Sequence, residues 1–201
     1  MDIRKNILAQ ARAMFMRYGI RSVTMDDLAR DLGVSKKTLY QHIENKEDLI
    51  RQVFEYDIET ERQLVERLKK TAPNAIEEVL GIAKYVISQL QELSSTAVYD
   101  LQKYYGVVWK KMHKIHTEFT IGVIKNNLKR GIEEGLYRKE LDIKIIAKLY
   151  AGKTSLIIDE EVFPLKEFNK ENLFRVYIKY HLHGIVSEKG LGYLKEKGEF
   201  N

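Results

Sequence analysis

Apolar and polar residues alternate with the period of a helix along most of the chain, and runs with the two-residue period of a strand are hard to find. The chain has only two prolines, Pro73 and Pro164. We therefore predict an all-α protein. After a break, an aromatic stretch begins at Ser94 or Ser95, and the polar C-terminal end is expected to fray. The predicted helices lie at about 3–18, 24–32, 35–42, 45–70, 74–90, 107–134, 142–157 and 169–181, and the fraying end is 193–201.

Residues 24–46, TMDDLARDLGVSKKTLYQHIENK, predict two short helices joined by a tight turn. Thr24 is a favoured N-cap, and Asp27 stands three residues later, as in a capping box. Gly33 lies where a helix needs a left-handed residue to stop, and Ser35 caps the second helix. This layout is a helix-turn-helix, which presents its second helix to the major groove of DNA.

The second helix is too short to persist alone in water and needs a scaffold. Residues 3–18 supply one, because the following apolar residues recur with helical period: Ile3, Ile7, Leu8, Ala11, Phe15 and Tyr18. We therefore predict a compact three-helix DNA-binding domain over residues 1–46.

The side chains left outside the helix-turn-helix core carry chemistry suited to DNA. Lys36 and Lys37 can reach base edges or phosphates, and Gln41 can bond adenine in bidentate fashion. Thr24 and Ser35 are caps first, and Thr24 and Lys46 begin helices whose free N–H groups favour a phosphate. The predicted DNA-contacting residues are Thr24, Ser35, Lys36, Lys37, Thr38, Tyr40, Gln41, His42 and Lys46.

The stretch ILAQARAMFMRYGIRSVTMDDLARDLGVSKKTLYQHIENKEDLI, residues 7–50, resembles the TetR (tetracycline-repressor-like) family of transcriptional regulators. Gln41 replaces a frequent aromatic residue of that family, and Ile43 replaces a frequent Phe. The resemblance implies a helical effector-binding and dimerisation domain over residues 47–201. It also implies a homodimer that pairs its last two long helices in a four-helix bundle, and a small molecule that changes the spacing of the DNA-binding heads.

The last two predicted helices are apolar on more than one face, which fits a body on one side and a second copy of the chain on the other. Two heads on a twofold axis would read a palindromic operator. The predicted interface residues are Ile146, Leu149, Tyr150, Phe174, Tyr177, Ile178 and His181. The residues proposed to line an effector pocket are Tyr85, Tyr99, Tyr104, Tyr105, Trp109, Met112, His113, His116 and Phe119.

Charge and composition narrow the function further. The formal net charge is +5, but residues 1–50 hold 9 Lys/Arg against 7 Asp/Glu, so DNA binding needs positioned contacts rather than bulk charge. There is no cysteine, no long apolar run and no signal peptide, so we expect a cytoplasmic protein that does not enter a membrane.

Motifs for catalysis, a cofactor or a metal are not recognisable. Gly152-Lys153-Thr154 resembles the end of a phosphate-binding loop but lies in a predicted helix, and His113 and His116 lack a third ligand. We therefore predict a regulator, most simply a repressor, and not an enzyme. The alternatives are a helix-turn-helix protein without an inducer and a helical enzyme or carrier whose head is a relic.

Overall fold

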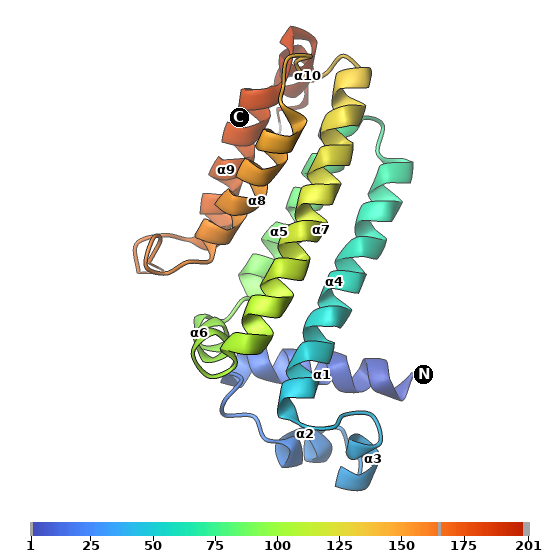
Figure 1. The fold of residues 1–201 in the computed structure, drawn as a ribbon, viewed down its shortest axis with the longest axis vertical. Coiled ribbons are helices and arrows are strands. Elements are labelled where there is room, and N and C mark those ends of the chain that lie inside the picture. Colours follow the sequence, from blue (N-terminus) through green and yellow to red (C-terminus); the bar gives the residue numbers. More distant parts are fainter. Residues whose placement is uncertain (1, 165, 199–201) are drawn as a thin grey trace. The chain divides into compact units, whose positions relative to one another are not determined.

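In a computed structural model, which describes residues 2–164 and 166–198, the chain is built from helices (Figure 1). Within these ranges the one β-type pairing is an isolated bridge between Tyr137 and Val186, so the predicted all-α class is confirmed. The helices are α1 (Ile3–Tyr18), α2 (Met25–Asp31), α3 (Lys36–Tyr40), α4 (Lys46–Thr71), α5 (Ala75–Glu92), α6 (Ser95–Tyr104), α7 (Gly106–Glu133), α8 (Ile143–Ile157), α9 (Lys170–Ile185) and α10 (Glu188–Lys197).

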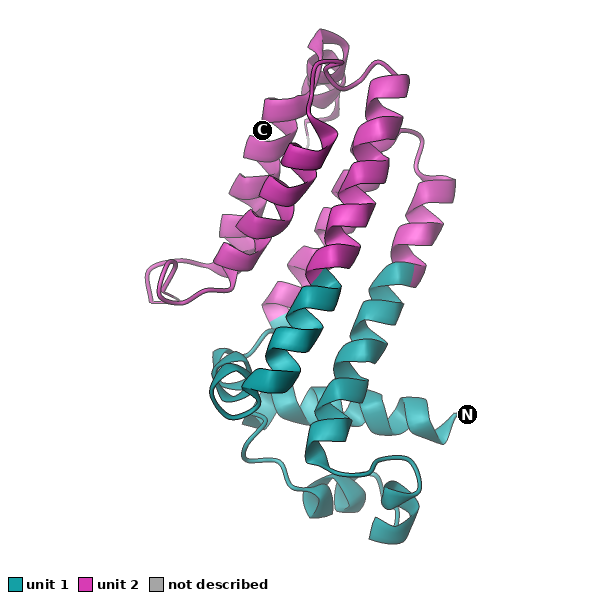
Figure 2. Cartoon of the chain, viewed as in Figure 1, with its two compact units in different colours: residues 1–62, 92–116 teal, residues 63–91, 117–201 magenta. Residues whose placement is uncertain are grey.

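The chain forms two compact units that interleave along the sequence (Figure 2). Unit 1 comprises residues 1–62 and 92–116, and unit 2 comprises residues 63–91 and 117–201. The helices α4 and α7 each contribute a segment to both units. The predicted DNA-binding domain, 1–46, thus shares unit 1 with the first part of α4, with α6 and with the start of α7.

The core of unit 1 joins α1, α2, α3, the start of α4 and α6. Its fully buried members include Ile7, Leu28, Leu39, Ile43 and Ile50. The helix α1 packs against both α2 and α6. A close approach to α6 follows α1, because a Cβ at Gly19 would lie 2.9 Å from Thr96 Cγ2, and Gly19 has a φ of +82°.

The core of unit 2 is built from α5, the second half of α7, α8, α9 and α10. Tyr137 is buried with its ring against Gly131, where a Cβ would lie 2.0 Å from the ring. Its hydroxyl donates to Asn127 Oδ1 at 3.0 Å, and Asn127 Nδ2 donates to the carbonyl of Ala75 at 2.9 Å. A buried hydroxyl and amide are thereby satisfied, which removes the cost of burying them.

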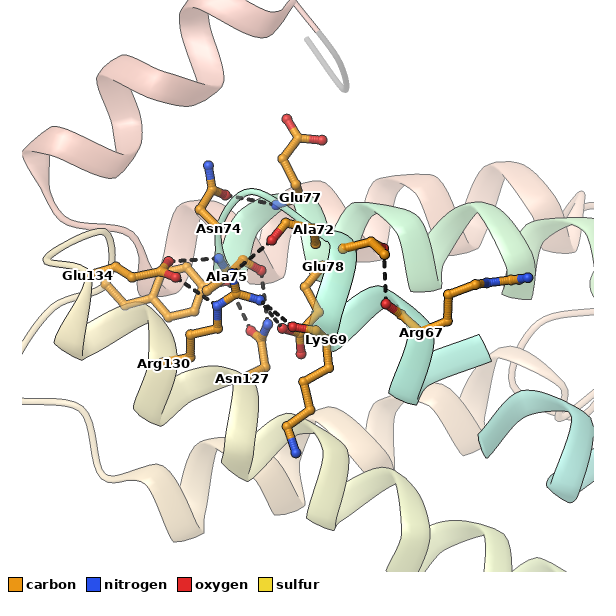
Figure 3. Close-up of polar contacts among 12 residues, drawn as sticks. Arg67, Lys69, Ala72, Asn74, Ala75, Glu77, Glu78, Asn127, Arg130 and Glu134 are labelled. Atoms are coloured by element: carbon orange, nitrogen blue, oxygen red, sulfur yellow. Dashed lines mark hydrogen bonds and ion pairs between the residues drawn. The ribbon is translucent and has the colours of Figure 1, made fainter. Parts of the chain in front are cut away.

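Arg130 of α7 ties the end of α4 to the start of α5 (Figure 3). Its guanidinium donates to the carbonyl of Lys69, in the last turn of α4, at 3.4 Å and to the carbonyl of Ala72, just after the helix, at 2.9 Å. Carbonyls at the end of a helix lack a partner within it. Arg130 also donates to Glu78 and Glu134, at 2.7 Å each. One side chain therefore fixes the junction between two helices.

The polar end of the chain departs from the sequence-based expectation. Residues 193–201 were expected to fray, but α10 extends to Lys197, and only the segment after residue 198 lies outside the described residues. Leu194 is buried, and the hydroxyl of Tyr193 donates to Glu77 Oε1 at 2.9 Å. Tertiary contacts thus hold a helix that its composition alone does not stabilise.

No helix among the described residues has the length and apolar character needed to cross a membrane.

Candidate nucleic-acid interface

The helix α2 begins as its sequence predicts. The hydroxyl of Thr24 accepts from the backbone N–H of Asp27 at 3.1 Å, and the carboxylate of Asp27 accepts from the backbone N–H of Thr24 at 3.1 Å. These reciprocal bonds are the predicted capping box, which is confirmed. Hydrogen bonds from the Thr24 hydroxyl and N–H lower the pKa of Asp27. Gly33 has a φ of +66° where the predicted stop falls.

The helix α3, which the sequence predicts to be the recognition helix, is shorter than its sequence pattern suggests, with five residues from Lys36 to Tyr40. Ser35 caps it, because its hydroxyl accepts from the backbone N–H of Thr38 at 3.0 Å. Leu39 is fully buried in the core of unit 1 and anchors the helix. Gln41 and His42 were placed in this helix by sequence, but they lie in the turn that follows it.

The polar face of α3 is turned to solvent. Lys37 and Tyr40 on the helix are exposed, as is Gln41 just beyond it. Thr38 and His42 are half-buried, and the Thr38 hydroxyl lies 2.8 Å from that of Ser35. Lysine, tyrosine and glutamine side chains so exposed can reach phosphate oxygens and base edges.

Lys36 is also exposed, but it is already engaged within the protein. Its ammonium forms an ion pair with Asp26 of α2 at 2.5 Å. A contact from Lys36 to DNA would therefore compete with this surface ion pair, which is a weak interaction in water.

Lys46, at the start of α4, bonds back to the turn between α1 and α2. Its Nζ donates to the carbonyl of Arg21 at 3.1 Å. Desolvation lowers the pKa of Lys46, although the charges of Asp100 and Asp27 oppose this shift. An ammonium has three N–H donors, so a phosphate contact stays open to it after this bond.

Asp48 and Gln52 fix the turn after α3, and sequence reasoning did not identify Gln52. The carboxylate of Asp48 accepts from the backbone N–H of Glu44 at 3.0 Å and from Gln52 Nε2 at 2.8 Å. Gln52 Nε2 also donates to the carbonyl of His42 at 3.2 Å. No residue type singled out Gln52, because Asp48 and Glu55 on the same helix face are also polar. The pair holds the residues that follow α3.

The predicted interface residues of the last two long helices lie mostly inside unit 2. Leu149 is exposed and Ile146 is half-buried. The other five side chains pack within the unit and are not available to a partner surface. These buried residues are Tyr150, Phe174, Tyr177, Ile178 and His181. Helical periodicity identified apolar faces without telling which of them faces inward.

The residues predicted to line an effector pocket are divided between the two units. Tyr85 and Phe119 belong to unit 2, whereas the other seven belong to unit 1. Among the latter, Tyr105 and Trp109 pack on the core of unit 1, Met112 is buried, and Tyr99 and Tyr104 are exposed.

The histidines of this set have environments of their own. The ring of His113 stacks on Trp109 with centroids 5.0 Å apart, and desolvation together with the charge of His116 lowers its pKa. His116 Nε2 lies 2.9 Å from Glu61 Oε2. Desolvation lowers the pKa of His116, but the bond to Glu61 and its charge outweigh this effect and raise the pKa above 6.5. Among the described residues, no group of three or more His, Asp or Glu side chains could hold a metal ion.

The chain is similar in sequence to known regulators. The sequence model described as "Bacterial regulatory proteins, tetR family" matches residues 7–53. The chain is 24% identical to YvaF of Bacillus subtilis, an uncharacterized HTH-type transcriptional regulator, over 92% of this chain and 96% of that protein. It is 21% identical to the HTH-type transcriptional repressor KstR2 of Mycolicibacterium smegmatis, over 93% and 92% of the two chains. These relatives are regulators rather than enzymes.

Solved structures share the fold. SmeT, the repressor of the Stenotrophomonas maltophilia multidrug efflux pump SmeDEF, matches with a TM-score of 0.72 at 16% identity, over 92% of this chain and 91% of that chain. A complex of SmeT with triclosan matches with a TM-score of 0.66 at 18% identity, over 94% and 93%.

Proposed function

We propose that the chain is a DNA-binding transcriptional regulator of the TetR family that represses transcription as a homodimer on a palindromic operator. The observation that carries this proposal is α3. Its apolar residue Leu39 is fully buried, while Lys37, Tyr40 and Gln41 are exposed around it. A short helix anchored in this way presents its polar side chains to the major groove.

The exposed apolar side chains of α8 and α9 support dimerisation. On α8 they are Ile145, Leu149 and Leu156, and on α9 they are Val176 and Tyr180. Leu149 is 50% exposed and Tyr180 is 64% exposed. Burying such a side chain contributes about 1.5–3 kcal/mol, and a contiguous apolar surface marks a site of association.

Two glycines lie on the same helix faces and have no explanation within one chain. Gly152 falls between Leu149 and Leu156 at helical spacing, and Gly184 follows Tyr180 by one turn. A Cβ at either glycine would meet nothing within 4 Å. Glycine inside a helix costs about 1 kcal/mol relative to alanine, and close approach of a second helix would offset that cost.

The two faces adjoin one another. The helices α8 and α9 pack together, and Lys153 Nζ of α8 lies 4.4 Å from the centroid of the Tyr180 ring of α9. We therefore place the dimer interface on Ile145, Leu149, Gly152 and Leu156 of α8 and on Val176, Tyr180 and Gly184 of α9. This set revises the interface predicted from sequence, of which Leu149 is kept.

A small-molecule effector is part of the proposal. SmeT has been solved with triclosan, so a protein of this fold binds an aromatic small molecule. In this chain, Trp109, His113, His116 and Glu61 place an indole, two imidazoles and a carboxylate near one another within unit 1. A ligand that prefers the arrangement unsuited to DNA would weaken DNA binding by its differential affinity.

Binding to the intergenic DNA upstream of the protein's own gene tests the proposed function. Fluorescence anisotropy with 30-base-pair duplexes that tile this region should find tight binding to one duplex that contains an inverted repeat. A scrambled version of that duplex is the control, and equal affinity for both would contradict a sequence-specific regulator. Release by a compound from a small-molecule screen would separate this reading from a helix-turn-helix protein without an inducer.

A further inference from the structure

Unit 1 carries a second exposed group of cations outside the helix-turn-helix. We call it the α6 cluster, and it consists of Arg21, in the turn between α1 and α2, and of Tyr99, Lys103 and Tyr104 of α6. Tyr99 is 53% exposed and Tyr104 is 42% exposed, and both cations are exposed as well. Large aromatic side chains exposed at a surface mark a site of interaction, and here two of them lie beside two positive charges.

The tyrosines hold the two charges in place. Arg21 Cζ lies 4.7 Å from the centroid of the Tyr104 ring, and Arg21 Nη1 donates to the Tyr104 hydroxyl at 3.0 Å. Lys103 Nζ lies 4.9 Å from the centroid of the Tyr99 ring and 5.5 Å from that of Tyr104. Cation–π contacts of this kind order a cation while leaving N–H donors free for an anion.

No carboxylate in the described part of the chain neutralises the cluster. Among the described residues, neither Arg21 nor Lys103 forms an ion pair with an Asp or Glu side chain. Asp100 lies on the same helix, but it is buried, and its Oδ2 accepts from the backbone N–H of Arg21 at 2.8 Å. Asp100 therefore fixes the turn, and the cations of the cluster face solvent.

The cluster is continuous with the predicted phosphate contacts of the head. The carbonyl of Arg21 accepts from Lys46 Nζ at 3.1 Å, and the chain reaches the N-cap Thr24 three residues after Arg21. Lys46 and Thr24 are both expected to contact phosphates. Since residues 1–50, which include Arg21, carry a net charge of only +2, a further cation such as Lys103 beside them would matter for affinity.

We propose that the α6 cluster binds the sugar–phosphate backbone of DNA next to the half-site read by α3. This inference rests on the proposed function, because it extends the same DNA interface. Arg21 supplies a planar guanidinium suited to a phosphate, Lys103 supplies a second charge, and the two hydroxyls add donors. Contacts to the backbone carry no sequence information, so the cluster adds affinity and not specificity.

The test is the salt dependence of DNA binding by the full chain. The double variant Arg21→Ala/Lys103→Ala removes two phosphate contacts, so the slope of log Kobs against log [salt] should become shallower by about 2. The loss in affinity should be equal on the operator and on a scrambled duplex. The charge-conserving variant Arg21→Lys/Lys103→Arg should keep the slope close to that of the wild type.

The matched control is Lys129→Ala/Lys195→Ala, which removes two exposed cations from unit 2. It should leave the slope unchanged. If the Arg21→Ala/Lys103→Ala variant keeps a wild-type slope and a wild-type melting temperature while the wild-type protein binds DNA, the α6 cluster does not contact DNA, and a protein partner is the better explanation. If the wild-type protein binds no duplex, the proposed function itself fails.

Discussion

Arg130 donates to Glu78 Oε2 at 2.7 Å, and this ion pair lies at the centre of the junction between α4, α5 and α7 (Figure 3). Glu78 is 3% exposed, so its carboxylate depends on Arg130 for compensation. The same guanidinium bonds Glu134 and the end of α4. Because a buried charge without a partner is costly, this pair determines whether the junction can form.

Arg130→Ala should destabilise the protein by about 3–5 kcal/mol, since it leaves Glu78 buried without a partner and removes the bonds to the end of α4. The free energy of unfolding, measured by urea denaturation, checks this. Arg175→Ala is the matched control, because it breaks an exposed ion pair with Glu171 one turn away, and it should cost at most about 1 kcal/mol. Equal losses in the two variants would contradict this account of the junction.

His181 should make the protein less stable in mild acid. Burial, with a smaller contribution from the charge of Lys153, lowers the pKa of His181 to about 4. Its Nε2 has no hydrogen-bond partner among residues 2–164 and 166–198. The unfolded chain takes up a proton near pH 6.5 that the folded chain does not accept until about pH 4. Stability is therefore complete above pH 6.5 and falls as the pH is lowered toward 4.

Between pH 7 and pH 5, His181 should contribute a loss of about 2 kcal/mol in the free energy of unfolding. His181→Phe keeps a flat ring against Tyr150 and Tyr177 but cannot bind a proton. Urea denaturation at both pH values should show a smaller loss for the variant by this amount. The same pH dependence in both proteins would show that His181 is not buried in its neutral form.

A charged side chain introduced into the proposed dimer interface should dissociate the dimer. Leu149→Asp places a carboxylate on the exposed apolar face of α8, so we expect a dimer in the wild-type protein and a monomer in the variant by sedimentation equilibrium. Val107→Asp is the control, because Val107 is an exposed apolar residue on α7. A wild-type monomer at tens of micromolar, or equal effects of both variants, would rule out this interface.

Residues of the recognition helix should divide into two groups. Gln41→Ala and Lys37→Ala should change sequence preference, with about 1–3 kcal/mol lost on the operator and less on scrambled DNA. Tyr40→Phe should weaken binding to both duplexes alike, because it removes a contact to phosphate. Titrations of each variant against both duplexes measure the affinity lost on each. If both groups of variants lose equal affinity on the two duplexes, the division into base contacts and phosphate contacts is wrong.

Local signals in the sequence predicted the DNA-binding head well. Thr24, Asp27 and Gly33 act within one or two turns of a helix, so their residue types specify the capping box and the stop that the structure contains. The end of α3 was harder to predict, because Gln52 and Asp48 hold the following turn through bonds that span up to ten residues.

Tertiary packing explains where the structure differs from the predictions made from the sequence. Leu149 and Tyr150 are adjacent in sequence, and both were predicted from the apolar pattern to lie in the interface. Tyr150 is buried in unit 2, whereas Leu149 is exposed. The packing of α9 against α8 decides which face of α8 turns inward, because the Tyr150 ring contacts the rings of Tyr177 and His181. Likewise α10 is held by Leu194 and by the bond from Tyr193 to Glu77, whose partner lies 116 residues away in sequence.

Selection of bound duplexes from a random DNA library tests the central claim most directly. The wild-type protein should enrich one inverted repeat whose half-sites are related by the twofold axis of a dimer, and Gln41→Ala should enrich a repeat that differs within each half-site. Enrichment of no sequence, or of a single site without a repeat, would contradict the account of a dimer that reads DNA with α3.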